Sequence, residues 1–446
     1  MRSGRLQRPS ASPVAAQASP TSLPFPALAL LVALQIPWIF SIGDLRLTPY
    51  RLVLLILLPT CLLRWMSGKV GKVRLTDVAL FLFCGWCAVA MVAIHGLSDA
   101  IEPAGILFLE TMGGFLVARC YIRDEASFRM MAKVLFLISV ILLPFALHEA
   151  LTGGKVLLNT FRLIMPTYID VGMPERWGLD RAQGNYIHPI HFGVNIGSTL
   201  TLTFLVLGYG KSPYVRMFKS SLVFLTSFLS LSSGPLTSMV GQIALLSWDR
   251  MSRGFPMKWS VLAIGGLAVF IMIEMFANRS LAVILIGYFA FDEYSAYIRT
   301  LTWQYGTQSI MNHPLWGVGF GPWDKPEWLT SSIDMHWIID AVRHGIPAGF
   351  LVFLAFFSAL LAVGRAPISD EKLSTYRTAY MITMVGFFMT GWAVYFWESS
   401  YILFTFLLGS GFWLIEADAA PSSISQIRRS GAATKNLRQR NSRENG

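Results

Sequence analysis

The chain has 446 residues, of which 54% are hydrophobic and only 14% charged. A soluble protein of this length would form two or three domains and would carry far more charge. The sequence instead contains apolar runs of about 20 residues, long enough to cross a ~30 Å hydrocarbon core as helices. The composition therefore excludes an ordinary soluble enzyme and favours an all-α, polytopic membrane protein.

We predict about twelve membrane spans between two polar tails. The tails at 1–22 and 417–446 are rich in polar and basic residues, which is typical of disorder, and the membrane domain fills 23–416. Span seven is separated from span eight by Ser232-Ser233-Gly234-Pro235, so these two are expected to form a short, broken pair. The expected spans are 25–43, 49–66, 76–95, 101–120, 130–150, 188–209, 215–231, 234–248, 258–276, 345–363, 378–396 and 398–415.

Charge predicts the orientation of these spans. If the N-terminus is cytoplasmic, the segments on its side of the membrane carry 26 of the 36 Lys and Arg residues. Positive residues are retained in the cytoplasm during insertion, so both termini are predicted to be cytoplasmic, in a bacterial inner membrane. The net charge of +11 is then largely a topology signal, and nucleic acid is not an expected partner.

Two long loops are predicted on the opposite, periplasmic side, at 151–187 and 277–344. Long connections between packed elements are usually functional, and most of the external ionisable residues gather in these two. More than one residue inside the ends of the expected spans, the only acidic residues are Glu110 and Glu274, whereas a transporter would place ionisable groups near the midplane. In the second loop, Leu281–Ala290 is too short to span and is expected to lie in the membrane interface, either under a lipid-borne substrate or against the bundle.

The first loop ends in a dense polar motif that runs into span six: Asp180-Arg181-Ala-Gln-Gly184-Asn-Tyr-Ile-His188-Pro189-Ile-His191. The two histidines are three residues apart, as metal ligands can be, but no third ligand follows. Cys84-Gly-Trp-Cys87 likewise has no second ligand pair and lies inside a span, where cysteines act as small apolar residues. We therefore predict no metal site.

The second loop carries two motifs. The first begins at Arg299 and Trp303 and continues through Asn312-His-Pro314-Leu-Trp-Gly317-Val-Gly319-Phe-Gly321. Its alternating glycines let backbone approach a ligand or another segment closely, but without a βαβ setting they are not a nucleotide fingerprint. The second motif, Asp334-Met-His336-Trp-Ile-Ile-Asp340-Ala-Val-Arg-His-Gly345, leads into span ten.

Together these residues resemble the O-antigen polymerase and O-antigen ligase superfamily over most of the chain. The stretch from Arg181 through Gly184 to His188-Pro189 is similar to that family's Arg-x-x-Gly…Asn/His-Pro motif. Leu231-Ser-Ser-Gly234 resembles its Leu-Ser-x-Ser-Arg-Gly element, with Ser233 where arginine is usual. The segment from Arg299 to Gly321 looks like its most recognisable motif.

The resemblance departs from the ligases at the expected base. Asp334 stands where the ligases have their catalytic histidine, and a histidine follows two residues later at His336. An aspartate there is more similar to an exopolysaccharide polymerase-like branch. Either side chain is a candidate base, and Asp334 is favoured by its spacing from Gly345. The alternative role for Asp334 is the N-cap of the helix that enters span ten.

The resemblance implies glycosyl transfer from an undecaprenyl-diphosphate-linked glycan, without cofactor or metal. Arg181 and Arg299 are the candidate ligands of the diphosphate, while Gly184, Trp303, Pro314, Gly317, Gly319 and Gly321 shape the loops. The expected function is polymerisation of repeat units of a surface polysaccharide, such as O-antigen or exopolysaccharide. Membrane lipid is an expected partner, as are a flippase and a chain-length regulator of the same pathway. The alternatives are a ligase that transfers glycan to lipid A core, a transporter of lipid-linked glycans, and an envelope scaffold.

Overall fold

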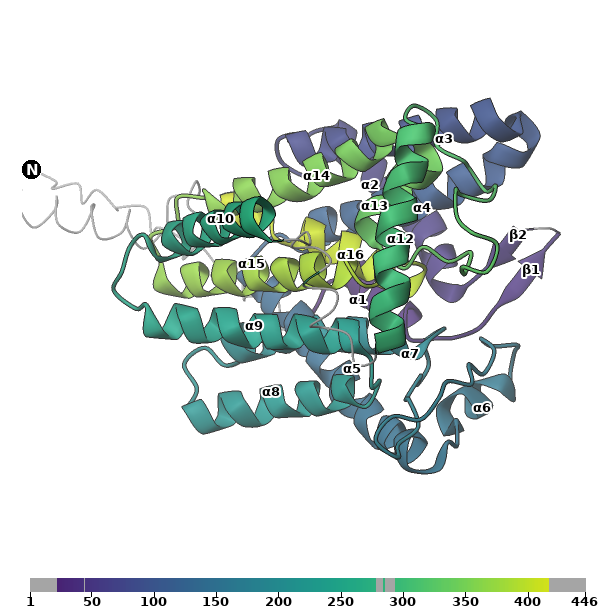
Figure 1. Ribbon diagram of the computed structural model, residues 1–446. Helices are drawn as coiled ribbons and strands as arrows, with labels where there is room; N and C mark the ends of the chain where they lie inside the picture. Colours follow the sequence, from purple (N-terminus) through teal and green to yellow (C-terminus); the bar gives the residue numbers. More distant parts are fainter. Residues whose placement is uncertain (1–21, 44, 278–283, 285–292, 417–446) are drawn as a thin grey trace, which may run out of the picture.

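The computed structural model describes residues 22–43, 45–277, 284 and 293–416. Within these ranges the chain is mostly helical, and strand is confined to the hairpin of β1 (Phe40–Ile42) and β2 (Leu45–Leu47) and two isolated bridges. Most long helices run in roughly the same direction, and α12 (Glu293–Asn312) crosses one end of the bundle, where β1, β2 and α6 (Val156–Arg162) also lie (Figure 1). The predicted all-α fold class is confirmed.

Eight helical segments of the described chain are long and apolar enough to cross a membrane. This supports the expected membrane location, and these segments account for most of the twelve expected spans. They are α2 (Pro49–Met66), α3 (Leu75–His95), α4 (Leu97–Tyr121), α5 (Glu125–Thr152), α7 (Pro189–Gly197) continued by the π-helix η1 (Leu202–Leu207), α10 (Lys258–Phe276), α14 (Ile346–Gly364), and α16 (Ser399–Ser410) continued by α17 (Trp413–Glu416).

The first expected span, 25–43, is not a membrane-length helix. It folds as α1 (Phe25–Ala33), which has nine residues, followed by an irregular stretch and strand β1. Pro37 cannot donate a backbone hydrogen bond and would break a continuing helix. Its carbonyl instead accepts from Tyr168 N, and Trp38 forms a β-bridge with Thr167, so this segment pairs with the first long loop.

Three other expected spans form helices of lower apolarity. These are α8 (Pro213–Phe228), α9 (Ser233–Met251) and α15 (Glu371–Gly391), which pack with α7 and η1 in one group. Their shared interior is partly polar: the buried Gln242 amide accepts from Thr201 Oγ1 at 2.8 Å and donates to Gly197 O at 3.1 Å. Polar side chains that hydrogen-bond across helices in this way explain why hydropathy alone ranks these helices low.

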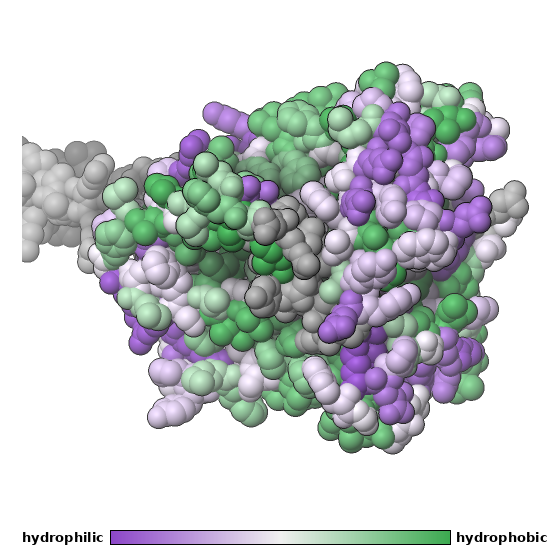
Figure 2. Space-filling view, in the orientation of Figure 1, coloured by the Kyte–Doolittle hydropathy of each residue, from purple (hydrophilic) through white to green (hydrophobic). Residues whose placement is uncertain are grey.

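The described part of the second long loop contains the 20-residue α12 and the short α13 (His336–His344). α12 is longer than the short interfacial helices that were expected in this loop. Apolar residues of α12 pack against α13 and its preceding segment, including Ile298, Leu301 and Ile310. The predicted interfacial segment Leu281–Ala290 lies outside the described residues. Figure 2 shows hydrophilic residues along α12 and near α6, at the end of the bundle that carries both loops.

Close helix contacts in the bundle depend on glycine. A Cβ atom at Gly409 of α16 would lie 2.4 Å from the backbone oxygen of Phe115 in α4. At Gly266 of α10 the same atom would meet nothing within 4 Å, and α10 has no buried residue among those described. The α4–α16 contact is therefore a close packing of small residues, of the kind that membrane helices use.

Gly409→Ala should destabilise the protein by about 1–3 kcal/mol, because a backbone oxygen cannot move aside as a flexible side chain would. Gly266→Ala is the matched control, and replacing an open helical glycine should stabilise by about 0.5–1 kcal/mol. Thermal unfolding of both purified variants in detergent measures the difference. Equal melting temperatures in the two variants would contradict the close packing of α4 on α16.

Candidate functional site

A turn formed by Ser230 to Ser233 follows α8 and ends on the first residue of α9. It collects arginines from both long loops. Arg181 Nη2 donates to Ser232 Oγ at 2.8 Å, and Arg181 Nε donates to Ser230 O at 3.4 Å. Arg299 Nη2 donates to Ser233 Oγ at 3.1 Å. The structure thus brings Arg181 and Arg299 to neighbouring residues of one turn, which we name the serine turn.

The serine turn has an unusual backbone. Leu231 has a φ of 46°, a left-handed conformation that a branched side chain seldom adopts. Its carbonyl accepts from Arg176 Nη1 at 2.7 Å, a third arginine contact to the same turn. Strained residues persist where the surroundings hold them in place, and they cluster at functional sites.

Arg176 was missed by sequence analysis because no spacing or motif marks it. It begins a tight turn, with a bridge between Arg176 and Leu179 and positive φ at Trp177 and Gly178. The exposed Trp177 ring stacks on Phe228 of α8 at 6.0 Å, which fixes the turn beside the serine turn. Gly178 after Trp177 indicates a turn in the sequence, but this pattern does not predict which group Arg176 contacts.

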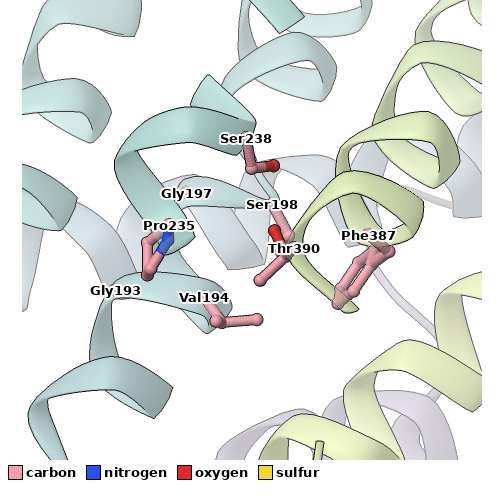
Figure 3. Close-up of a pocket in the computed structure, with 8 residues that line it drawn as sticks. All are labelled: Gly193, Val194, Gly197, Ser198, Pro235, Ser238, Phe387 and Thr390. Atoms are coloured by element: carbon pink, nitrogen blue, oxygen red, sulfur yellow. The ribbon is translucent and has the colours of Figure 1, made fainter. Parts of the chain in front are cut away.

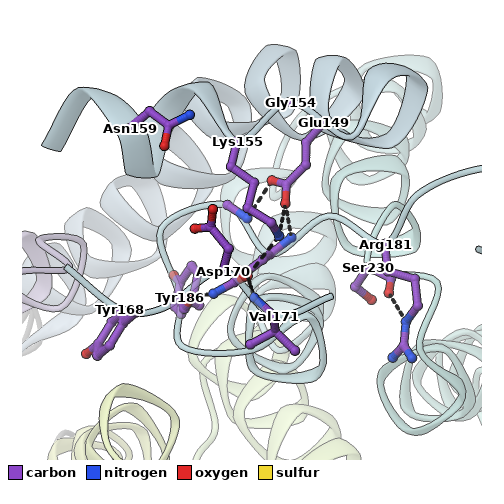
Figure 4. Close-up of polar contacts among 12 residues, drawn as sticks. Glu149, Gly154, Lys155, Asn159, Tyr168, Asp170, Val171, Arg181, Tyr186 and Ser230 are labelled. Atoms are coloured by element: carbon purple, nitrogen blue, oxygen red, sulfur yellow. Dashed lines mark hydrogen bonds and ion pairs between the residues drawn. The ribbon is translucent and has the colours of Figure 1, made fainter. Parts of the chain in front are cut away.

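Arg181 is positioned by a buried carboxylate near the end of α5. Glu149 of α5 accepts from Gln183 N at 3.0 Å and from Gly184 N at 2.9 Å, and Lys155 Nζ lies 3.0 Å from the same carboxylate (Figure 4). Lys155 also donates to Gln183 Oε1 at 2.9 Å. Gly184 has a φ of +59°, so its predicted loop-shaping role has a local geometric basis. This network fixes the backbone from which Arg181 reaches the serine turn.

Arg299 lies near the start of α12, whose packing against α13 sets its position. Ile298 and Trp303 contact the apolar cluster that includes Met335 and Ile338, and the Trp303 ring lies 5.8 Å from that of Trp392. Trp303 therefore helps to hold α12 against the bundle. The register of α12 on α13 decides where the Arg299 guanidinium lies.

The glycine-rich motif packs against the end of α13. Gly317 and Gly319 have positive φ, and a Cβ at Gly317 would lie 2.4 Å from the Arg343 carbonyl carbon. Val318 N and Gly319 N donate to the last carbonyls of α13, and Pro314 O accepts from Ile346 N at 2.8 Å. The alternating glycines were expected to allow close approach of either a ligand or another chain segment. The described residues show the close approach of another chain segment, the end of α13. Gly321 does not have positive φ among these residues.

Asp334 and His336 lie in different environments. Asp334 is exposed, and its carboxylate accepts from Ser332 Oγ at 2.5 Å. It does not cap α13, because the N-cap is Met335 and no side chain caps this helix. The N-cap alternative for Asp334 is therefore wrong: the helix begins two residues later.

His336 is enclosed by aromatic rings. It is 1% exposed, and among the described residues neither ring nitrogen has a hydrogen-bond partner. The rings around it are those of Trp337, Tyr395, Phe396, Tyr401 and Phe404. Burial lowers the pKa of His336 to about 3, so its imidazole stays neutral and is a weak base.

One segment, residues 392–398, touches both the start of α13 and the start of α9. Val394 O accepts from His336 N at 3.3 Å. On the other side, a Cβ at Gly234 would lie 2.7 Å from Val394 Cγ2, so the start of α9 touches the same residue. Val394 therefore lies between the start of α13 and the start of α9, the helix that follows the serine turn.

The histidines of the first loop have structural partners. His188 caps α7, its Nδ1 accepting from Ile190 N at 3.1 Å, and burial together with Arg181 and Lys155 lowers the pKa of His188 to about 4. His191 Nδ1 lies 2.8 Å from Ser400 Oγ. Within the described ranges no cluster of three His, Cys, Asp or Glu residues is arranged to hold a metal ion.

A small cavity lies beneath the serine turn. Its volume of about 10 Å³ is close to the space that one water molecule needs, and Ser198, Ser238 and Thr390 supply hydroxyl groups to its wall (Figure 3). Gly193 and Pro235 close it towards the turn. A cavity of this size is too small for a sugar or a diphosphate.

A scan of known protein families finds no family model that matches this chain, and a search of curated proteins finds no similar sequence.

The burial of His336 predicts a specific pH dependence of stability. Its pKa in the folded protein lies below the ordinary 6.5, so the unfolded state binds more protons between pH 6.5 and about 3 and stability falls as pH falls. At pH 5 the neutral, buried His336 lowers the free energy of unfolding by about 2 kcal/mol relative to neutral pH. His336→Phe, which keeps an aromatic ring, should lose less stability than the unmodified protein between pH 7.5 and pH 5.

Thermal unfolding of both proteins at the two pH values checks this. Asp340 lies one turn further along α13, and burial raises its pKa to about 7 while Arg343 opposes this shift. Because both proteins contain Asp340, its contribution to the pH dependence of stability cancels in the comparison. Identical losses of melting temperature in the two proteins would show that His336 is not held neutral.

Proposed function

We propose that this chain is a membrane glycosyltransferase that polymerises undecaprenyl-diphosphate-linked repeat units of a surface polysaccharide. The observation that carries the proposal is the meeting of Arg181 and Arg299 on neighbouring serines of one turn, from two loops more than a hundred residues apart in sequence. Their position at the end of a bundle of membrane-length helices suits a substrate whose lipid lies in the bilayer and whose diphosphate lies at its surface.

The two guanidinium groups match the charge of the leaving group. In the transfer, an acceptor hydroxyl oxygen attacks the anomeric carbon of the donor glycan, and the bond from that carbon to the diphosphate oxygen breaks. The electron pair stays on the lipid diphosphate, whose negative charge is stabilised by donors already aimed at it. Arginine supplies planar, paired donors for phosphate oxygens, and neither nucleotide nor metal is needed for this step.

Ser233 accepts a hydrogen bond at a position where the resembling family has a cationic side chain. The resembling family has arginine at this position, where this chain has serine. Serine instead provides an oxygen that accepts from Arg299 Nη2. In this chain the cation therefore reaches the turn from α12, and Arg176 adds another from the first loop.

Asp334 is the proposed general base. It is exposed and lies two residues before α13, the helix on which α12 with Arg299 packs. A carboxylate there takes the proton that the acceptor hydroxyl loses on attack. His336 is less suited, because its buried ring has a pKa of about 3 and no contact with solvent. The proton later returns to solvent, so Asp334 is ready for the next transfer.

The direct test uses purified protein in lipid bilayers with lipid-linked repeat units as the only glycan. The proposal expects longer glycan chains and release of undecaprenyl diphosphate. Transfer only to an added lipid A core would indicate a ligase, and movement of intact substrate across the bilayer without bond formation would indicate a transporter. Either result would overturn the proposed polymerisation.

Replacing Arg299 with Lys should reduce the rate nearly as much as replacing it with Ala, on the order of 100-fold, because lysine keeps the charge but loses the planar fork. Arg162→Ala is the matched control in the first loop: its side chain is about 40% exposed and pairs with Asp170. The rate of chain growth is the measurement. Full activity of Arg299→Lys would show that a simple positive charge is sufficient at this position.

Asp334→Asn should stop chain growth, with a loss of at least about 100-fold, while leaving the protein inserted and abundant. The amide oxygen can still accept from Ser332, and Asp334 caps no helix, so folding should be preserved. Glu327→Gln, an exposed acid in the same loop, is the control. His336→Gln should retain most activity per folded molecule. The reverse pattern, with Asp334→Asn active and His336→Gln inactive, would assign the base to the imidazole.

A further inference from the structure

A groove lies between α2 and α4, beside strand β2, and none of its lining residues belongs to the serine turn. Its charged lining residues are Arg51 and Glu102. Its volume is about 350 Å³, which is within the range of small-molecule sites. The wall is mostly apolar, from Leu55, Ile101, Ile106 and Leu109. Gly105 opens it, since a Cβ there would meet nothing within 4 Å among the described residues. The groove thus offers space for a hydrocarbon chain along two membrane-length helices.

Arg51 is the cationic group of this groove. Its side chain is 10% exposed, and its Nε donates to Glu110 Oε1 at 2.8 Å. Nη1 donates to Arg46 O at 2.9 Å, at the end of the β-hairpin. Among the described residues, the remaining terminal nitrogen, Nη2, has no hydrogen-bond partner. A buried, rigidly held guanidinium with one free edge lining a groove is a built site for an anionic oxygen.

Glu102 is the anionic group of the groove. It lies on α4, is exposed, and forms no ion pair with any described residue. The groove therefore has one positive and one negative group at its polar margin that are not paired with each other. Because Glu110 already balances Arg51, a purely anionic head group would meet an unfavourable local charge, whereas a head group with both signs would satisfy both side chains.

We propose that this groove binds a zwitterionic phospholipid with a primary ammonium group, such as phosphatidylethanolamine. Its phosphate oxygen accepts from Arg51 Nη2, its ammonium donates to the Glu102 carboxylate, and one acyl chain lies along Leu55, Ile106 and Leu109. An ammonium with N–H groups is specified over a choline head, because the quaternary amine of choline has no hydrogen to donate to a carboxylate. The proposal rests only on the groove and does not depend on the glycosyl-transfer function.

The groove is linked to the 392–398 segment through the β-hairpin. Arg46 Nη2 of the hairpin lies 3.3 Å from Glu398, which ends this segment and is the N-cap residue of α16. A lipid held at Arg51 would thus brace the hairpin against the same segment that carries Val394. Binding is accordingly expected to raise the thermal stability of the full chain.

Native mass spectrometry of the full chain in detergent, with added lipids of identical acyl chains, tests the proposal. Phosphatidylethanolamine should be retained about fivefold more tightly than phosphatidylcholine or phosphatidylglycerol, the scale of one exposed charge pair. Glu102→Gln should remove this preference, and Glu102→Lys should reverse it towards phosphatidylglycerol. Asp99→Asn, which removes a nearby exposed charge of α4 outside the groove, should leave the preference unchanged.

Equal retention of the three lipids by the unmodified protein would overturn the proposal. So would a preference for phosphatidylglycerol, which would show that Arg51 binds phosphate without help from Glu102. A preference for phosphatidylethanolamine that survives Glu102→Lys would place the lipid elsewhere on the surface, and the assignment to this groove would then be wrong.

Discussion

The site depends on how a nearly buried guanidinium is held next to a membrane domain. Arg181 is only 6% exposed, and a charge with so little solvent is stable only when other groups satisfy it. The serine turn supplies Ser232 Oγ and Ser230 O for this purpose, and it adopts a left-handed residue at Leu231 in doing so. The connection between α8 and α9 is thus shaped around the arginine, and Arg299 and Arg176 use the same turn.

The rest of the structure holds the partners of that turn in place. Glu149 fixes the backbone of the first loop from the end of α5, so Arg181 is positioned from a long membrane helix. The second loop is held by α12 on α13, and the glycine motif packs against the end of α13. Residues 392–398 lie between these parts, since Val394 contacts both His336 and the start of α9. Preorganisation of this kind suits a reaction whose main demand is stabilisation of charge on a leaving group.

The sequence predicted the elements that depend on local composition and missed those that depend on distant partners. Long apolar runs such as 76–95 and 345–363 became α3 and α14, because hydrophobic length alone determines a span. The run at 25–43 was equally apolar, but Pro37 and pairing with Thr167 divert it into a short helix and a hairpin. α12 was missed because it contains few apolar residues, and those such as Ile298 and Leu301 pack on the cluster around α13, so no long apolar run marks it in the sequence.

The same distinction applies to the candidate site. Motif spacing singled out Arg181, Arg299, Asp334 and His336, but only the fold shows that the two arginines share a turn and that His336 lies among aromatic rings from residues 395–404. Arg176 could not be identified from the sequence, since its partner is a backbone carbonyl 55 residues away. Burial and long-range hydrogen bonds are properties of packing, which one sequence does not encode in any local pattern.

We propose that Arg181 and Arg299 act together on one diphosphate. Binding of undecaprenyl diphosphate to the purified chain, to Arg181→Ala, to Arg299→Ala and to the double variant measures this as a double-mutant cycle. A shared site predicts that each single variant weakens binding strongly and that the double variant is weakened by much less than the product of the two single effects. Strictly multiplicative losses, or unchanged affinity in either single variant, would show that the two arginines do not bind a common ligand.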